Sequence, residues 1–144
     1  MWSAPSVLSR CYRLHSLGFR PPFEAGDQIG RGFADVGFEE FSLLDPSTAL
    51  SLLTGKQSKL KAEDLPHFFL IPSVDLTSAY IYERGYDLIK IEYNDQREWS
   101  CCIKGPGGAE LECRAQSLQE ALLDALIFAY STTPGFAGFR VVKT

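Results

Sequence analysis

Any catalytic or metal chemistry in this chain would depend first on its cysteines and histidines. The sequence contains four cysteines and two histidines: Cys11, Cys101, Cys102, Cys113, His15 and His67. No pair of them has the spacing of a zinc site, such as C-x₂₋₄-C or H-x₃₋₅-H, and there is no C-x-x-C redox pair. We therefore assign no metal, cofactor or catalytic residue, and we predict reduced, mostly buried thiols.

Cys102 is the cysteine best placed to be reactive. On the strand expected around it, its side chain lies on the polar face near Lys90, Lys104 and Arg114. A cationic neighbourhood lowers the pKa of a thiol and makes it more nucleophilic. An incidental strand residue is the simpler interpretation, so thiol chemistry at Cys102 is kept only as an alternative.

A glycine-rich stretch, Ile29-Gly30-Arg31-Gly32-Phe33 followed by Val36, is similar to the glycine-rich loop of protein kinases. Its spacing is one residue short, and neither a lysine-bearing strand nor a catalytic-loop aspartate follows it. The lysine and hydroxyl of a phosphate-binding P-loop are absent as well. Residues 20–37 are therefore predicted to be a turn-rich loop, and small-molecule binding at residues 26–37 remains an alternative.

The paired carboxylates have an ordinary interpretation. Glu110 and Glu112 share one face of an expected strand with Arg114, which predicts ion pairing on the surface. By the same logic, Glu39 and Glu40 are predicted to be solvated.

Composition limits the classes of protein that remain. The chain has 144 residues, of which 45% are hydrophobic and 22% charged, as in a soluble globular domain. No apolar run approaches the 18 or so residues of a membrane span. The net charge of −4 gives no reason to expect nucleic-acid binding. A contact of that kind through Arg10, Arg13 and Arg20 is a third, weaker option.

The first 23 residues contain three arginines and no acid, a composition typical of an organelle transit peptide. A short amphipathic helix with a basic outer face explains them more simply, and we expect a cytoplasmic protein.

The second half has clear periodicity. We expect a helix from Ser73 to Arg84 ended by Gly85, then three antiparallel strands over residues 88–93, 99–104 and 109–114. With three-residue loops, Trp99 lies opposite Ile91 and Cys113, and Cys101 lies opposite Ile89 and Leu111. One face of this meander is then apolar and the other charged.

A helix over residues 117–131 follows, opened by the Ser117–Glu120 capping box. It is apolar around most of its circumference and therefore needs cover from more than the sheet. Residues 139–142 are expected to form a short last strand.

The first half is less regular. The pattern predicts a helix ending at Gly18, and a second helix that begins at Asp45-Pro46 and ends at Gly55. A charged connection over residues 56–64 and a buried strand or packed loop over 68–71 follow. The predicted fold is a single α+β domain, 1–144. It comprises a helical, loop-rich half (1–65) and a helix-meander-helix half (66–144), with the N-terminal helices covering the C-terminal helix.

Residues 72–130 resemble the phage-type ABA sandwich domain. The resemblance is carried by Pro72-Ser73-Val74-Asp75, Ala79-Tyr80, Gly85, Trp99, Gly105–Gly108 and the segment Ala115–Ala125. Tyr80 departs from the pattern, in which we would look for Trp. The resemblance implies a sheet layered with helices and a mobile-element origin, and it implies no activity. The second face of the predicted meander is charged, which does not fit a fold in which helices pack on both sides of the sheet.

These observations predict a non-enzymatic, phage- or prophage-like accessory protein that binds another protein, such as a host or defence factor. This expectation depends on the absence of any complete catalytic constellation and on the family resemblance. The alternative is a small-molecule-binding or thiol-dependent enzymatic domain. The sequence does not predict the oligomeric state.

Overall fold

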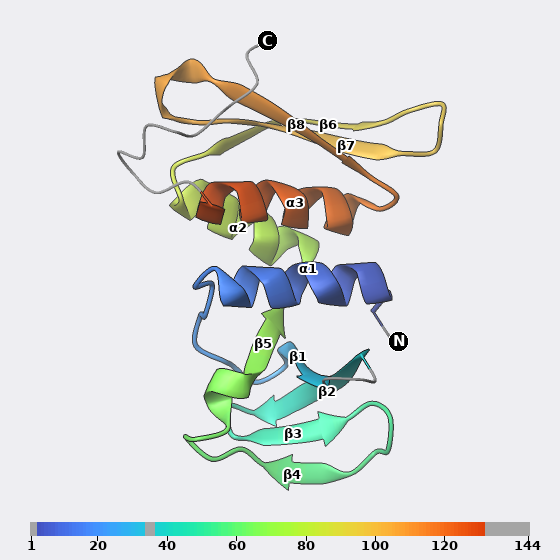
Figure 1. The fold of residues 1–144 in the computed structure, drawn as a ribbon, viewed down its shortest axis with the longest axis vertical. Helices are drawn as coiled ribbons and strands as arrows, with labels where there is room; N and C mark the ends of the chain where they lie inside the picture. The colour runs from blue at the N-terminus through green and yellow to red at the C-terminus, as the bar shows by residue number, and fades with distance from the viewer. Residues whose placement is uncertain (1–2, 34–36, 132–144) are drawn as a thin grey trace. The chain divides into compact units, whose positions relative to one another are not determined.

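The computed structural model describes residues 3–33 and 37–131 (Figure 1). The chain divides into two compact units, residues 1–72 and 73–144, and each is described by itself. The α+β class is confirmed, because helices combine with antiparallel sheets in the described chain. The single domain over 1–144 stays a prediction, and the strand expected at 139–142 lies outside the described residues.

The first unit contains a helix and a five-stranded antiparallel sheet. Its elements are α1 (Pro5–Ser16), β1 (Gln28–Phe33), β2 (Gly37–Asp45), β3 (Thr48–Ser51), β4 (Gln57–Lys59), the 3₁₀ turn η1 (Leu65–His67) and β5 (Phe68–Ile71). The strand order is β4-β3-β2-β1-β5, so the last strand of the unit pairs with the first. The prediction of a helical, loop-rich half is therefore wrong.

The helix predicted to begin at Asp45-Pro46 is in fact the turn between β2 and β3. Asp45 Oδ1 accepts hydrogen bonds from Ser47 N at 2.9 Å and from Ser47 Oγ at 3.0 Å. An aspartate in this position supports a tight turn as well as it caps a helix. Because the chain reverses here, Ala49 becomes a fully buried residue of β3.

Helix α1 is the predicted first helix, and it ends at Ser16, two residues before the predicted end at Gly18. Its buried stripe is Val7, Leu8, Cys11 and Leu14, and it contacts β5 and β1. Gly18, at φ +105°, follows its end, which is the left-handed conformation that glycine adopts most readily. The buried strand predicted at residues 68–71 is confirmed as β5.

The loop predicted for residues 20–37 is wrong over 28–33, which form β1, a central strand of the sheet. Gly30 of this strand lies opposite Phe69 in the β1–β5 register. A Cβ atom on Gly30 would lie 2.6 Å from the Phe69 ring. Glycine is needed here because the ring of Phe69 occupies the space of a side chain.

The second unit is the predicted helix-meander-helix. Its elements are α2 (Val74–Glu83), β6 (Asp87–Tyr93), β7 (Trp99–Lys104), the short 3₁₀ turn η2 (Pro106–Gly108), β8 (Glu110–Ala115) and α3 (Leu118–Ser131). The strands form a three-stranded antiparallel sheet in the order β6-β7-β8. Both helices lie on one side of this sheet in Figure 1.

The faces of the meander are as predicted, but the register differs by two residues. Trp99 pairs with Tyr93 and Ala115, and Cys101 pairs with Ile91 and Cys113. Each turn is centred one residue later than expected; the first is closed by Asn94 N donating to Glu98 O at 3.0 Å, which leaves residues 95–97 as the loop. A shift of two residues keeps each side chain on its face. The predicted position of Ile89 is wrong, because a bulge between Leu88 and Lys90 interrupts the register.

Helix α3 packs on β7 and β8 as predicted, and α2 packs against α3. The thiol of Cys101 donates to Ala121 O at 3.4 Å, which marks the apolar side of the sheet as the side facing α3. Ser117 caps α3 as predicted, with Ser117 Oγ accepting from Glu120 N at 3.1 Å and lying 2.8 Å from Glu120 Oε1.

More than one N-terminal helix was expected to cover α3. This number is wrong, since the described part of the first unit has one α-helix. No described helix has the length and hydropathy that a membrane span requires.

Candidate binding groove

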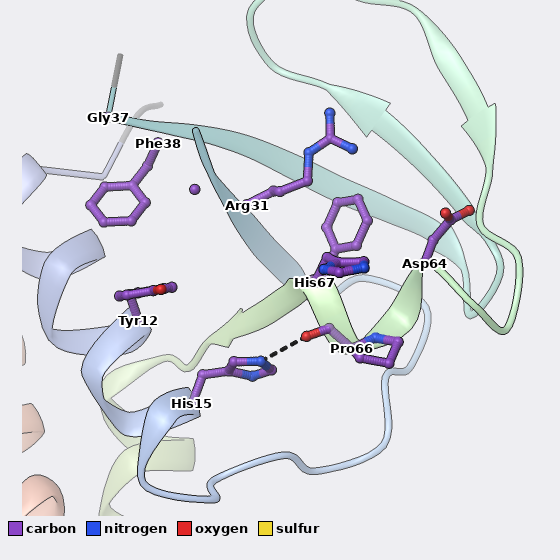
Figure 2. Close-up of a pocket in the computed structure, with 10 residues that line it drawn as sticks. Tyr12, His15, Arg31, Gly37, Phe38, Asp64, Pro66 and His67 are labelled. Atoms are coloured by element: carbon purple, nitrogen blue, oxygen red, sulfur yellow. Dashed lines mark hydrogen bonds between the residues drawn. The ribbon is translucent and has the colours of Figure 1, made fainter. Parts of the chain in front are cut away.

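A groove of about 860 Å³ opens on the first unit (Figure 2). It is bordered by α1, by the facing parts of β1 and β2, and by the segment that includes η1. The lining residues are Tyr12, His15, Arg31, Gly32, Gly37, Phe38, Asp64, Pro66, His67 and Phe68. The groove therefore depends on the pairing of β1 with both β2 and β5, which brings distant parts of the chain together.

One end of the groove is aromatic. The Tyr12 and Phe38 rings have centroids 5.7 Å apart, and the Phe69 ring lies behind them, 5.9 Å from Tyr12 and 5.6 Å from Phe38. Such tilted and edge-to-face contacts hold aromatic rings in defined orientations. Tyr12 is still 49% exposed. The end of the groove thus offers an ordered and accessible apolar surface.

Arg31 supplies a positive charge to the groove. Its guanidinium lies 5.3 Å from the Phe68 ring centroid and 5.9 Å from that of Phe41, within the range of cation–π attraction. Its Nη2 atom lies 4.0 Å from Glu39 Oε1, the residue opposite it in the β1–β2 register. An ion pair at that distance on a partly exposed side chain is weak. The rings orient the guanidinium, and 40% of the side chain remains exposed.

His15 connects α1 to the opposite wall of the groove. Its Nε2 atom lies 2.9 Å from the Pro66 carbonyl oxygen, as the dashed line in Figure 2 shows. Partial burial lowers the pKa of His15, and nearby Arg20 lowers it further, whereas the bond to the Pro66 carbonyl raises it; the net direction is down. The imidazole is therefore neutral at pH 7, and Nε2 donates to the carbonyl. His15 thus serves to hold the wall that carries His67.

His67 and Asp64 form the other end of the groove (Figure 2). His67 is exposed, whereas Asp64 Oδ2 accepts a hydrogen bond from Lys61 N at 3.0 Å within its own turn. The described residues that line the groove include no serine, threonine or cysteine. The arrangement can hold a ligand that combines an apolar group with a negative one, and it lacks the nucleophile–base pair of a hydrolase.

The glycine-rich stretch contributes to the groove in a way that its motif did not indicate. Arg31 and Gly32 line the groove from strand β1, whereas the sequence predicted a turn-rich loop at these residues. Tyr12, His15 and His67 were not predicted to meet. They lie on α1 and on a connection some 50 residues later, so no local pattern could have found them.

The surroundings of Cys102 are not the cationic neighbourhood that the sequence predicted. Its thiol donates to Glu110 Oε1 at 3.6 Å, and Glu112 lies opposite it on β8. Burial and then Glu110 raise the pKa of Cys102, the opposite of the shift that activates a thiol. Lys90 is its partner on β6 but does not reverse this direction. A protonated thiol beside carboxylates gives no support to thiol catalysis.

The remaining cysteines have structural environments. Cys11 and Cys101 are buried, and Cys101 pairs with Cys113 across β7 and β8. Burial raises the pKa of Cys11 to about 12. Within residues 3–33 and 37–131, no three His, Cys, Asp or Glu side chains are grouped as a metal site would require.

Of the predictions for the paired carboxylates, one is confirmed and one is wrong. Glu112 is exposed and lies 3.4 Å from Arg114 Nε, which confirms the predicted surface pair. The prediction that Glu40 is solvated is wrong, because only 2% of the residue is exposed. Its carboxylate accepts hydrogen bonds from Ser3 N at 2.8 Å and Ser3 Oγ at 2.9 Å. Glu40 thereby ties the residues before α1 to β2.

Comparisons of the chain with models of protein families, with curated proteins and with solved structures give no match.

Proposed function

We propose that this chain is a non-enzymatic accessory protein that binds a short segment of another protein in the groove of its first unit. The observation that carries the proposal is the pairing of an accessible aromatic end, Tyr12 and Phe38, with the ring-oriented guanidinium of Arg31. Ordered aromatic and arginine side chains dominate the energetics of protein recognition. The groove supplies both without a nucleophile beside them.

The chemistry of the groove defines the segment that fits it. An apolar side chain would pack against Tyr12 and Phe38, and a carboxylate would pair with Arg31, whose fork of N–H donors matches that group. His67 can donate one further hydrogen bond from the exposed end. The expected ligand is therefore an extended peptide with an aromatic or aliphatic residue a few positions from an acidic residue or a C-terminal carboxylate.

Selection from a library of displayed random peptides tests the proposal on the full chain. Peptides that share an apolar and an acidic position should be enriched, and synthetic copies should bind in a fluorescence polarisation assay. Tyr12→Ala and Arg31→Gln should each weaken binding by about tenfold or more, as the loss of an interface anchor does. Circular dichroism of both variants verifies that the fold is retained.

Lys59→Gln is the matched control, because it removes a positive charge from β4, a strand of the same sheet that does not line the groove. It should leave peptide binding unchanged. Two results would overturn the proposal: a selection without any shared pattern, or binding that persists at full strength in both groove variants.

A small aromatic anion is the second candidate ligand, favoured by the size of the groove, which lies within the range of about 300–1,000 Å³ that is usual for ligand pockets. Titration with benzoate and phenyl phosphate, followed through the ring proton resonances of His15 and His67, distinguishes the two. Saturable shifts with these probes, together with an empty peptide selection, would favour the small ligand.

The origin of the partner is a separate part of the proposal. The resemblance of residues 72–130 to the phage-type ABA sandwich domain is the reason to look for the partner among proteins of a bacterial cytoplasm, including defence factors. Gene neighbours test this part: phage genes beside the coding sequence would support it, and a neighbourhood without mobile elements would contradict it.

A further inference from the structure

The outer edge of β6 has the features of an interface. It belongs to the second unit, whereas the proposed peptide groove belongs to the first. In the described chain β6 is the end strand of its sheet and pairs only with β7. Such an edge presents backbone N–H and C=O groups that can accept another strand. An edge strand that also exposes apolar side chains is a site for association with another chain.

The hairpin bonds show which backbone groups face outward. Asn94 N donates to Glu98 O at 3.0 Å, and on the next loop Gly105 N donates to Ala109 O at 2.9 Å. In an antiparallel ladder only alternate residues bond to a given neighbour. Both bonds therefore assign Lys90 and Glu92 to the β7 side, and they leave the N–H and C=O groups of Ile91 and Tyr93 directed away from the sheet.

The side chains of β6 are unusually apolar for an exposed edge. Ile89, Ile91 and Tyr93 are 47%, 44% and 54% exposed. Helix α3 packs on β7 and β8, and α2 contacts β6, but these three side chains stay exposed. Between them stand Lys90 and Glu92, whose charged atoms lie 3.7 Å apart and whose side chains are 64% and 55% exposed.

We propose that β6 pairs antiparallel with β6 of a second copy of this chain, with Ile91 opposite Ile91 on a two-fold axis. In this register Lys90 of each copy lies opposite Glu92 of the other, so two ion pairs form across the interface. Ile89 lies opposite Tyr93, and the outward backbone groups of Ile91 bond to each other. The two three-stranded sheets become one six-stranded sheet.

Charge selects this register over its neighbours. Moving the axis to residue 90 places Lys90 opposite Lys90, and moving it to residue 92 places Glu92 opposite Glu92. Like charges directly opposite each other destabilise a strand pair, whereas opposite charges stabilise it. A shift that moves the axis between residues would place apolar side chains opposite charged ones.

The bulge between Leu88 and Lys90 limits the length of the new ladder. The contact is one short strand from each copy, so its area is at the small end for specific interfaces. We therefore expect a monomer–dimer equilibrium that shifts with protein concentration. Sedimentation velocity of the full chain over a dilution series should show it.

Charge reversal tests the register directly. Lys90→Glu alone and Glu92→Lys alone each convert both ion pairs into like-charge pairs, and each should raise the dissociation constant by at least about tenfold. The double variant Lys90→Glu/Glu92→Lys restores both pairs with their signs exchanged and should dimerise as the original chain does. Lys59→Glu, on the outer strand β4 of the other sheet, is the matched control and should change nothing.

A cysteine at residue 91 gives an independent readout. Ile91→Cys should form a disulfide-linked dimer under mild oxidation, with the bond mapped to residue 91 by mass spectrometry. A chain that sediments as a monomer at every concentration overturns the proposal, as does a dimer that is indifferent to Lys90→Glu. A monomer that dimerises only when residues 132–144 are removed also overturns it, because those residues would then be the occupant of the edge.

Discussion

Replacement of Gly30 by alanine should loosen the first unit, because one methyl group meets a ring that has no room to move. The new Cβ would lie 2.6 and 2.7 Å from two carbons of the Phe69 ring, well inside van der Waals contact. Phe69 is 1% exposed, and the rings of Tyr12 and Phe38 lie against it. The substitution must therefore displace the ring, the strand or both.

Two opposing effects set the size of the loss. Overpacking of a buried site typically costs about 1–3 kcal/mol. The φ angle of Gly30 is not positive, so alanine can adopt its backbone conformation. Alanine also lowers the conformational entropy of the unfolded chain, which stabilises the folded protein by about 0.4–1 kcal/mol. We expect the free energy of unfolding to fall by about 1–2 kcal/mol. Because the displaced ring supports Tyr12 and Phe38, ligand binding in the groove should weaken as well.

Urea unfolding of the full chain, followed by circular dichroism, measures the loss, and amide hydrogen exchange of β1 assigns it to the first unit. Gly32→Ala is the matched control, since its nearest contact would be 3.4 Å from Phe38, and it should change stability by less than about 0.5 kcal/mol. In a Phe69→Leu background the Gly30→Ala substitution should cost much less. An equal cost in both backgrounds would refute the steric explanation.

Two further predictions concern a helix cap and a buried thiol. Ser117→Ala removes the side-chain acceptor for Glu120 N and should lower the free energy of unfolding by about 1 kcal/mol in urea, whereas Ser131→Ala, at the other end of α3, should cost less. The pKa of Cys11 is raised from 9.0 to about 12, first by burial and then by Glu40, so the thiol ionises more readily in the unfolded chain. Its contribution to stability is therefore complete below pH 9 and is lost as the pH rises from about 9 towards 12. Cys11→Ala should flatten that part of the stability–pH curve, and an unchanged slope would contradict the assignment.

The second unit could be predicted closely because its signals are local and agree with one another. Alternation predicted the faces of β7, of β8 and of β6 after its bulge, and the Ser117–Glu120 spacing located the start of α3. The register could not be predicted, because the position of each turn along the chain depends on which pair of residues closes it. Asn94 and Glu98 close the first loop through a hydrogen bond that an earlier pair of residues could also have made on sequence grounds.

The first unit was predicted poorly because its sheet is held by pairings that are distant in the chain. Asp45-Pro46 is a signal shared by helix starts and by turns, and only the pairing of β2 with β3 decides between them. Glycines in β1 indicated a loop, although Gly30 serves to accommodate a ring from β5. The groove could not be predicted for the same reason, because Arg31 and His67 come to line one groove only once β1 and β5 are paired.

The strand order of the first sheet has a consequence for synthesis on the ribosome. Strands β1 to β4 follow one another as hairpins, but the second partner of β1 is the edge strand β5, whose last residue is Ile71. Nascent chains shorter than this expose one side of β1 and lack the apolar run Phe68–Ile71, although the hairpins can already form. Translation pauses after the hairpins have emerged but before β5 leaves the exit tunnel would therefore prolong an aggregation-prone intermediate, and chaperone contacts with the nascent chain should cease soon after β5 emerges.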